Sequence, residues 1–117
     1  MTPLEKGTIY ELRIYDAMPG RLPALLSRFE NHTLQMIWEK HGIRQAGFWT
    51  TLIGASENNR LTYLLTWNSM VQREERWNAF LTDPEWIAIK AETEKDGQLV
   101  QNISSELLAP TAFSSVK

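Results

Sequence analysis

The sequence contains no cysteine, which excludes disulfide bonds, thiolate metal sites and cysteine nucleophiles. No apolar run approaches the roughly 20 residues that a membrane-spanning helix needs, so no membrane partner is expected. The opening residues Met1 to Lys6 are not followed by the apolar stretch of a secretory signal. We therefore expect a cytoplasmic protein.

An excess of charge of one sign is also missing. Lys and Arg number 12 and Asp and Glu number 14, for a net charge of −2. A nucleic-acid surface normally shows a basic excess, so no nucleic-acid partner is expected. The 117 residues, 43% of them hydrophobic, suit one globular domain over residues 1–117.

Hydrophobic periodicity predicts a chain that alternates strands and helices. The expected strands are residues 8–15, 43–53, 61–67 and 99–108, and the expected helices are residues 22–41, 70–81 and 84–95. Ser69 with Gln72 forms a capping box, Asp83 precedes a proline at a helix start, and Gly42 suits a left-handed helix end. The order β-α-β-β-α-α-β predicts the α+β class, with a ferredoxin-like split β-α-β unit and an antiparallel sheet.

The strand at 61–67 has large side chains on both faces, with Tyr63 and Trp67 on one and Leu64 on the other. Helices cover only one face of a ferredoxin-like sheet, so the second face needs another cover. We expect a second copy of the chain to supply it. This predicts a homodimer with its sheets face to face, a dimeric α/β barrel with a cavity in each subunit.

Glu11 and Arg13 share one face of the first strand, whereas Tyr10, Leu12 and Ile14 form an apolar face. The apolar face is expected to meet the helices, which places Glu11 and Arg13 on the side without helices. A carboxylate and a cation in a half-apolar cavity would orient a small polar or anionic ligand. The alternative is an ion pair at the dimer seam or in solvent.

Trp49, Tyr63 and Trp67 are expected on neighbouring strands, where they would form walls of the cavity. Aromatic walls suit a flat or apolar ligand, although aromatic residues at this density also serve as core or interface. Trp77 and Trp86 follow the apolar spacing of their helices and are interpreted as core.

His41 is the candidate catalytic residue, as a general acid or base at the cavity mouth. The alternative is that it caps the last carbonyl groups of its helix. His32 lies nine residues away, a spacing that cannot bring both histidines to one metal ion. With no cofactor-binding motif in the sequence, we expect neither a metal nor a cofactor.

Trp38 falls nearly opposite the core stripe of its helix, with Leu34 one turn before it. An apolar pair in that place needs a cover. It supports an alternative function, that of a non-catalytic protein-interaction module that uses the Leu34/Trp38 surface.

Taken together, these pieces resemble the NIPSNAP family within the dimeric α/β-barrel superfamily. The matching stretches are Tyr10-Glu11-Leu12-Arg13 with Tyr15, Pro19-Gly20, Phe29-Glu30, His41-Gly42, Gly47-Phe48-Trp49-Thr50, Gly54, Leu64-Leu65-Thr66-Trp67, Arg73-Glu74 with Trp77, and Asp83-Pro84-Glu85-Trp86.

The resemblance implies ferredoxin-like units that dimerise through their sheets, in a family whose biochemical function is poorly defined. Sister families on the same architecture include cofactor-free monooxygenases. The expected function is therefore that of a homodimeric small-molecule-binding protein or a cofactor-independent, monooxygenase-like enzyme.

Overall fold

The computed structural model describes residues 8–56 and 58–117, which form a four-stranded antiparallel sheet in the order β2-β3-β1-β4. The strands are β1 (Ile9–Ala17), β2 (Arg44–Thr50), β3 (Arg60–Trp67) and β4 (Val100–Leu108). The helical elements are α2 (Leu22–Arg28), η1 (Phe29–Trp38) and α3 (Glu39–His41), which follow one another without a break, and then α4 (Met70–Leu81) and α5 (Pro84–Thr93). The predicted α+β, ferredoxin-like fold is confirmed.

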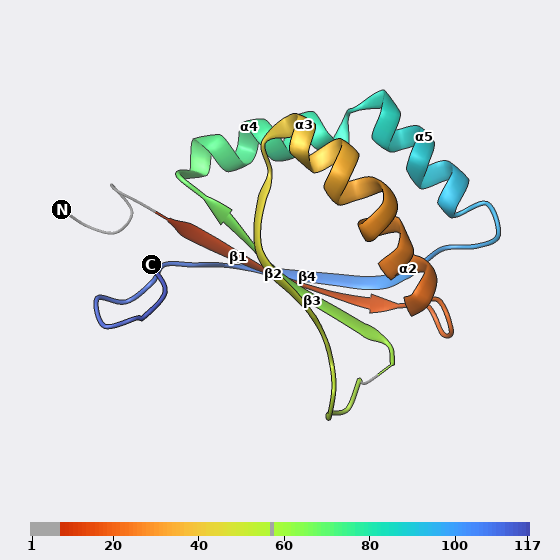
Figure 1. Cartoon of the computed structure of the whole chain (residues 1–117), viewed down its shortest axis with the longest axis horizontal. Coiled ribbons are helices and arrows are strands. Elements are labelled where there is room, and N and C mark those ends of the chain that lie inside the picture. Colours follow the sequence, from red (N-terminus) through yellow and green to blue (C-terminus); the bar gives the residue numbers. More distant parts are fainter. Residues whose placement is uncertain (1–7, 57) are drawn as a thin grey trace.

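All the helices lie on one side of the sheet, and the other side is left open (Figure 1). The expected helix ends are present. Ser69 Oγ accepts a hydrogen bond from the Gln72 amide at 3.0 Å, and Asp83 Oδ1 accepts one from the Glu85 amide at 2.8 Å. Gly42 ends the first helical segment with a φ of 68°. These local signals fix where the helices begin and end.

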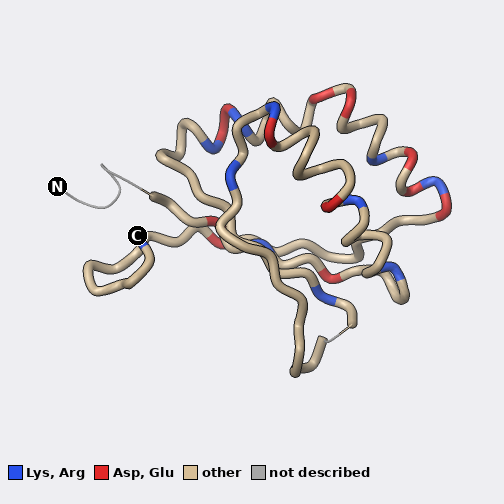
Figure 2. Tube along the Cα trace, in the orientation of Figure 1, with Lys and Arg blue, Asp and Glu red and all other residues tan. Residues whose placement is uncertain are grey.

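Acidic and basic residues alternate along the helices, without a long stretch of one sign (Figure 2). In the described parts of the chain, no helix is long and apolar enough to cross a membrane.

The first strand faces the helices with the side that the sequence pattern assigned to the open face. Glu11 and Arg13 are buried, whereas Leu12 and Ile14 on the other face are only partly covered. The expectation that Glu11 and Arg13 lie on the side without helices is therefore wrong. Burial of a charged pair is costly unless partners satisfy it, and here distant residues, Arg73 among them, supply those partners.

Trp38 is also placed differently from the prediction, because residues 29–38 form a π-helix rather than an α-helix. The hydroxyl of Thr33 donates to the carbonyl of Arg28, five residues earlier, at 3.3 Å. The wider turn rotates later residues relative to a 3.6-residue period. Trp38 is consequently 2% exposed, while Met36, which the 3.6-residue period assigned to the core, is 45% exposed.

The Leu34/Trp38 surface is therefore absent. Trp38 lies in an aromatic cluster between sheet and helices, with ring centres 5.7 Å from Phe29 and 6.0 Å from Phe80. Leu34 is partly buried and packs against the same core. The interaction-module alternative lacks its working surface.

Candidate functional site

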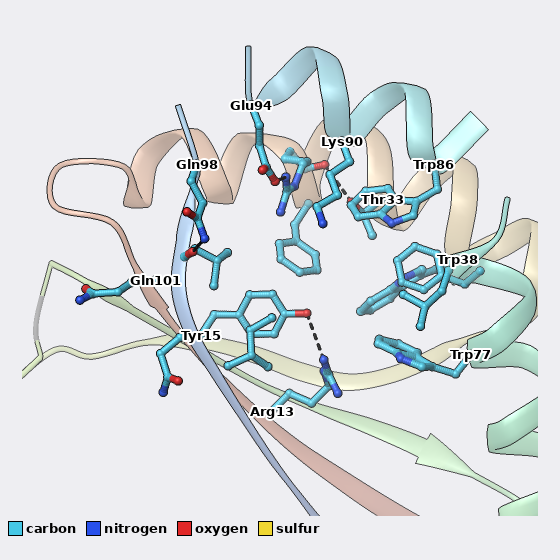
Figure 3. Close-up of a pocket in the computed structure, with 17 residues that line it drawn as sticks. Arg13, Tyr15, Thr33, Trp38, Trp77, Trp86, Lys90, Glu94, Gln98 and Gln101 are labelled. Atoms are coloured by element: carbon cyan, nitrogen blue, oxygen red, sulfur yellow. Dashed lines mark hydrogen bonds and ion pairs between the residues drawn. The ribbon is translucent and has the colours of Figure 1, made fainter. Parts of the chain in front are cut away.

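A cavity of about 470 Å³ lies between the sheet and the helices. Its size is within the range of small-molecule sites. Arg13 and Tyr15 line the cavity from the sheet, and Trp77 and Trp38 line it from the helices, with Trp77 next to Arg13 (Figure 3). The helices contribute most of the other lining residues, namely Arg28, Phe29, Thr33, Phe80, Leu81, Trp86, Lys90 and Glu94, and the segment from Gln98 to Ile103 completes the wall.

Arg13 is held at the sheet side of the cavity by bonds on every nitrogen of its guanidinium. Its Nε donates to Tyr63 Oη at 2.9 Å, its Nη1 to Glu11 Oε2 at 2.9 Å, and its Nη2 to Tyr15 Oη at 3.4 Å. Burial alone would lower the pKa of Arg13, but these neighbours outweigh it and raise that pKa. The group therefore stays charged. A cation fixed in this way provides a preorganised contact for a polar or anionic ligand.

Glu11 is fully buried beside Arg13 and is shared with a second arginine. Its Oε1 accepts from Trp67 Nε1 at 3.0 Å and from Arg73 Nε at 2.7 Å, and its Oε2 also accepts from Arg73 Nη2 at 3.2 Å. Burial raises the pKa of Glu11, but the hydrogen bonds from Arg73, Arg13 and Trp67 outweigh burial and hold the pKa below its usual value. One carboxylate thus serves two arginines, and one positive charge remains uncompensated.

The helix side of the cavity is built in part by the last residue of α2, by η1 and by α5. Arg28 Nη1 donates to Glu94 Oε2 at 2.8 Å and to Thr93 Oγ1 at 3.3 Å. The Arg28 guanidinium also lies 5.3 Å from the centre of the Trp86 ring. Lys90 lines the cavity on the same helix (Figure 3).

Four of the six predicted site residues are brought together. Arg13 lines the cavity, while Glu11, Tyr63 and Trp67 lie in the hydrogen-bonded cluster behind it. Tyr63 is fully buried, and burial raises its pKa well above the usual value, so its hydroxyl stays protonated. Tyr63 and Trp67 therefore do not form the wall of the cavity that the sequence predicts. They support Arg13 from behind, Tyr63 directly and Trp67 through Glu11.

Trp49 lies elsewhere. It pairs with Thr62 on β3, whose side chain faces away from that of Tyr63, and it is 52% exposed. It borders a second hollow of about 530 Å³ at the β2 edge, along with Leu34 and Phe48. The one-residue irregularity in β2 between Gln45 and Gly47 sets which β2 side chains face the helices.

His41 is not among the residues that line the cavity. Its Nε2 lies 2.6 Å from Asp83 Oδ2, at the junction of the first helical segment with α5. Asp83 also pairs with Lys40 at 2.6 Å, and the bonds from Lys40 and His41 hold the pKa of Asp83 far below its usual value. The expected position of His41 at the cavity mouth is therefore wrong, because its partner is the cap of another helix.

The cavity residues that the sequence analysis missed lie mainly on helices. Trp86, Lys90 and Glu94 are spaced four residues apart and share one side of α5 and its end. That spacing could have indicated a mixed aromatic and charged face. Tyr15 lies two residues after Arg13 on the same strand face, a spacing that could have indicated it as part of the site. Nothing in the local pattern marks Arg28, which follows the exposed Ser27 and precedes the buried Phe29.

In residues 8–56 and 58–117, no group of three His, Asp or Glu side chains could hold a metal ion. The site that the structure does provide is a cationic and aromatic cavity.

The NIPSNAP family model matches residues 10–115 of this chain. A NIPSNAP-like domain protein from Burkholderia xenovorans shares 25% identity, with a TM-score of 0.78 over 92% of this chain and 88% of that one. A NIPSNAP family protein of unknown function from Agrobacterium tumefaciens shares 24% identity, with a TM-score of 0.79 over 94% of each chain. No curated protein matches the sequence.

A more distant structure is that of a protein from Chloroflexus aurantiacus, provisionally named an antibiotic biosynthesis monooxygenase. It shares 13% identity with this chain. The TM-score is 0.56, over 95% of this chain and 100% of that one. This likeness shows a common fold alone.

Proposed function

Since the chain belongs to the NIPSNAP family, we propose that it is a homodimeric cytoplasmic protein that binds a small molecule in the cavity between its sheet and its helices. The observation that carries this proposal is the buried guanidinium of Arg13 at the side of an aromatic cavity of about 470 Å³. Small-molecule sites typically combine apolar walls with a few fixed polar groups.

The aromatic lining supports a flat or apolar ligand. Indole rings of Trp38, Trp77 and Trp86 and the phenyl ring of Phe80 border the same space. Such rings offer large contact surfaces at little cost in conformational entropy. Arg13 would then fix the orientation of the ligand, since its own position is set by four neighbouring side chains.

A substitution that fills the cavity tests the proposal. Ile103 on β4 lines the cavity and is 48% exposed, so Ile103→Trp adds bulk there without disturbing a buried core position. Leu52→Trp is the matched control, because Leu52 is 87% exposed in a loop outside the cavity. We expect aromatic ligands to quench or shift tryptophan fluorescence in the wild type and Leu52→Trp, and Ile103→Trp to lose that response. Equal responses in all three proteins would refute the cavity as the site.

The proposed homodimer rests on the open face of the sheet. Leu12, Ile14 and Leu64 are partly exposed there, and Trp49 is 52% exposed. Apolar side chains spread over one sheet face are best covered by a like surface, which makes a two-fold pair the simplest assembly.

Sedimentation velocity tests the dimer. The wild type should sediment at twice the 13.5 kDa chain mass at micromolar concentration, and Leu64→Glu should sediment as a monomer with an unchanged circular-dichroism spectrum. The matched control is Leu52→Glu, which should remain dimeric because Leu52 lies in an exposed loop. A monomeric wild type would contradict this part of the proposal.

Cofactor-independent oxygenation is the chemistry that we propose for a bound substrate that is electron-rich. Such reactions depend on an apolar pocket more than on a strong catalytic residue, and the aromatic rings of the cavity supply apolar walls. The distant likeness in fold to the Chloroflexus protein is compatible with this chemistry. His41 takes no part in it, because it lies outside the cavity. Oxygen uptake by the protein with its bound substrate, abolished in Ile103→Trp, would support turnover. If the bound substrate does not react, only the binding function stands.

A further inference from the structure

We propose that the cavity selects an organic anion, a carboxylate carried on a flat apolar body, over a neutral molecule of the same shape. The inference rests on the proposed binding function and adds the chemical class of the ligand. It is argued from the charge of the lining, from its unpartnered hydrogen-bond donors and from its aromatic walls.

The lining of the cavity is cationic. Arg13, Arg28 and Lys90 border it, and Glu94 is the one carboxylate among the lining residues. Glu11 behind Arg13 does not remove the excess, because it is shared with Arg73. The chain as a whole has a net charge of −2, so the positive excess belongs to this site and does not reflect overall composition. A fixed positive excess with aromatic walls favours binding of an anion.

The buried polar groups without a hydrogen-bond partner also favour a negatively charged ligand. In the described parts of the chain, the buried side-chain atoms without a hydrogen-bond partner are Arg21 Nε, Arg28 Nε and Trp38 Nε1. All three are N–H donors, and two of them belong to residues that line the cavity. A buried donor without an acceptor is unfavourable, so a ligand that supplies oxygen acceptors gains at this wall. Both atoms are covered by protein atoms.

The walls distinguish an organic anion from an inorganic one. Trp38, Trp77 and Trp86 present large apolar rings, and Phe29 and Phe80 fill the spaces between them. A sulfate or phosphate ion would contact the cations but leave these rings without a partner. An aromatic or similarly flat body attached to the carboxylate uses both features of the cavity.

Two of the cations that line the cavity, Arg13 and Lys90, have different roles. The Arg13 side chain is 10% exposed and is fixed against Tyr63, Tyr15 and Glu11, so it is the contact for the carboxylate. Lys90 is exposed on α5 at the border of the cavity. A mobile surface cation there attracts the anion from solution and is screened by salt.

The test is a calorimetric titration with matched acids and amides. The probes are benzoate and 2-naphthoate, each compared with its uncharged amide. We expect 2-naphthoate to bind the wild type about tenfold or more tightly than 2-naphthamide, because a charge-assisted bond to a guanidinium is lost in the amide. Amides that bind as well as the acids would overturn the anion inference and leave the proposed binding function standing. Failure of all four probes to bind would contradict both.

Two variants test the charge directly. Arg13→Gln should weaken 2-naphthoate binding by about ten- to a hundredfold and change amide binding far less. Because Arg13 is buried and its loss can impair folding, Lys90→Gln is the second variant. It should weaken the acid about two- to fivefold at low salt and leave the amide unchanged.

The matched control for Lys90→Gln is Lys95→Gln. Lys95 follows the same helix, is 63% exposed and does not line the cavity. It removes the same formal charge, so it should alter the affinity for 2-naphthoate much less than Lys90→Gln. Equal effects of the two substitutions, together with a preference for the acid over the amide that Arg13→Gln leaves unchanged, would refute the inference.

Discussion

The guanidinium carbon of Arg13 lies 4.5 Å from the centre of the Trp77 ring. This cation–π contact joins β1 to α4 across the layer between sheet and helices, and it is made in a desolvated place where such contacts are strongest. The same arginine borders the proposed ligand site. This pair of side chains therefore contributes both to the packing of α4 on the sheet and to the position of the ligand-orienting group.

Trp77 is the residue whose replacement tests this link. Trp77→Leu should lower the free energy of unfolding by about 2 to 4 kcal/mol, because it leaves a void and removes the cation–π contact. Trp77→Phe keeps an aromatic face for Arg13 and should lower it by less. Urea denaturation measures both. If Trp77→Leu is as stable as the wild type, the contact has no part in holding α4 on the sheet.

Glu11 gives the fold a pH dependence. A carboxylate whose pKa is lowered in the folded state stabilises the fold above its ordinary pKa, and this contribution is lost as the pH falls through the folded-state pKa. The ordinary value is 4.5. We therefore expect the wild type to lose stability more steeply than Glu11→Gln as the pH falls below that value.

At neutral pH, Glu11→Gln should be less stable than the wild type by about 3 kcal/mol, since two arginines lose their shared carboxylate. The gap between the two proteins should narrow on acidification. Some acid dependence remains in the variant because the pKa of Asp83 is also lowered, by Lys40 and His41. Parallel stability curves for the two proteins from neutral to acid pH would show that Glu11 makes no such contribution.

The π-helix makes a prediction that separates it from a regular α-helix. Trp38 is 2% exposed and Met36 is 45% exposed, the reverse of what a 3.6-residue period assigns to them. Trp38→Ala should destabilise the protein by about 3 to 5 kcal/mol, and Met36→Ala by less than about 1 kcal/mol. Thermal or urea unfolding distinguishes the two geometries, and a larger effect at Met36 would favour the regular helix.

Gly42 should resist replacement by alanine. Its φ of 68° is unfavourable for residues with a Cβ, and a Cβ there would lie 3.0 Å from Arg76 Nη1. Arg76 Nη1 also donates to the Gly42 carbonyl at 2.7 Å. We expect Gly42→Ala to cost about 1 to 2 kcal/mol and Gly42→Asn to cost less, because asparagine tolerates this conformation. A Gly42→Ala protein more stable than the wild type would contradict the strained geometry.

Local chemistry made the helix ends predictable. The expected helix at residues 70–81 coincides with α4 (Met70–Leu81), and the expected ends at Gly42, Ser69 and Asp83 are present. Capping and turn formation depend on a few neighbouring residues, so the sequence contains the necessary information. The order of the elements along the chain was predictable in the same way, because it depends on the periodicity of each segment.

Long-range partners made the site less predictable. Alternation in β1 separates Glu11 and Arg13 from Leu12 and Ile14, but it does not tell which face meets the helices. That choice depends on Arg73, which lies 62 residues away from Glu11 and satisfies its carboxylate. Trp38 was misplaced for another reason, since the pattern was interpreted with a 3.6-residue period where the chain has a wider turn.

The most direct test of the central claim is the response of the tryptophan indole N–H signals to a ligand in a ¹H–¹⁵N spectrum. The five tryptophans would be assigned with single Trp→Phe variants, and 2-naphthoate would be the ligand. Binding in the cavity predicts shifts for Trp38, Trp77 and Trp86, which line it, and none for Trp49, which lies outside it. Shifts confined to Trp49, or no shift at saturating ligand, would contradict a ligand site between the sheet and the helices.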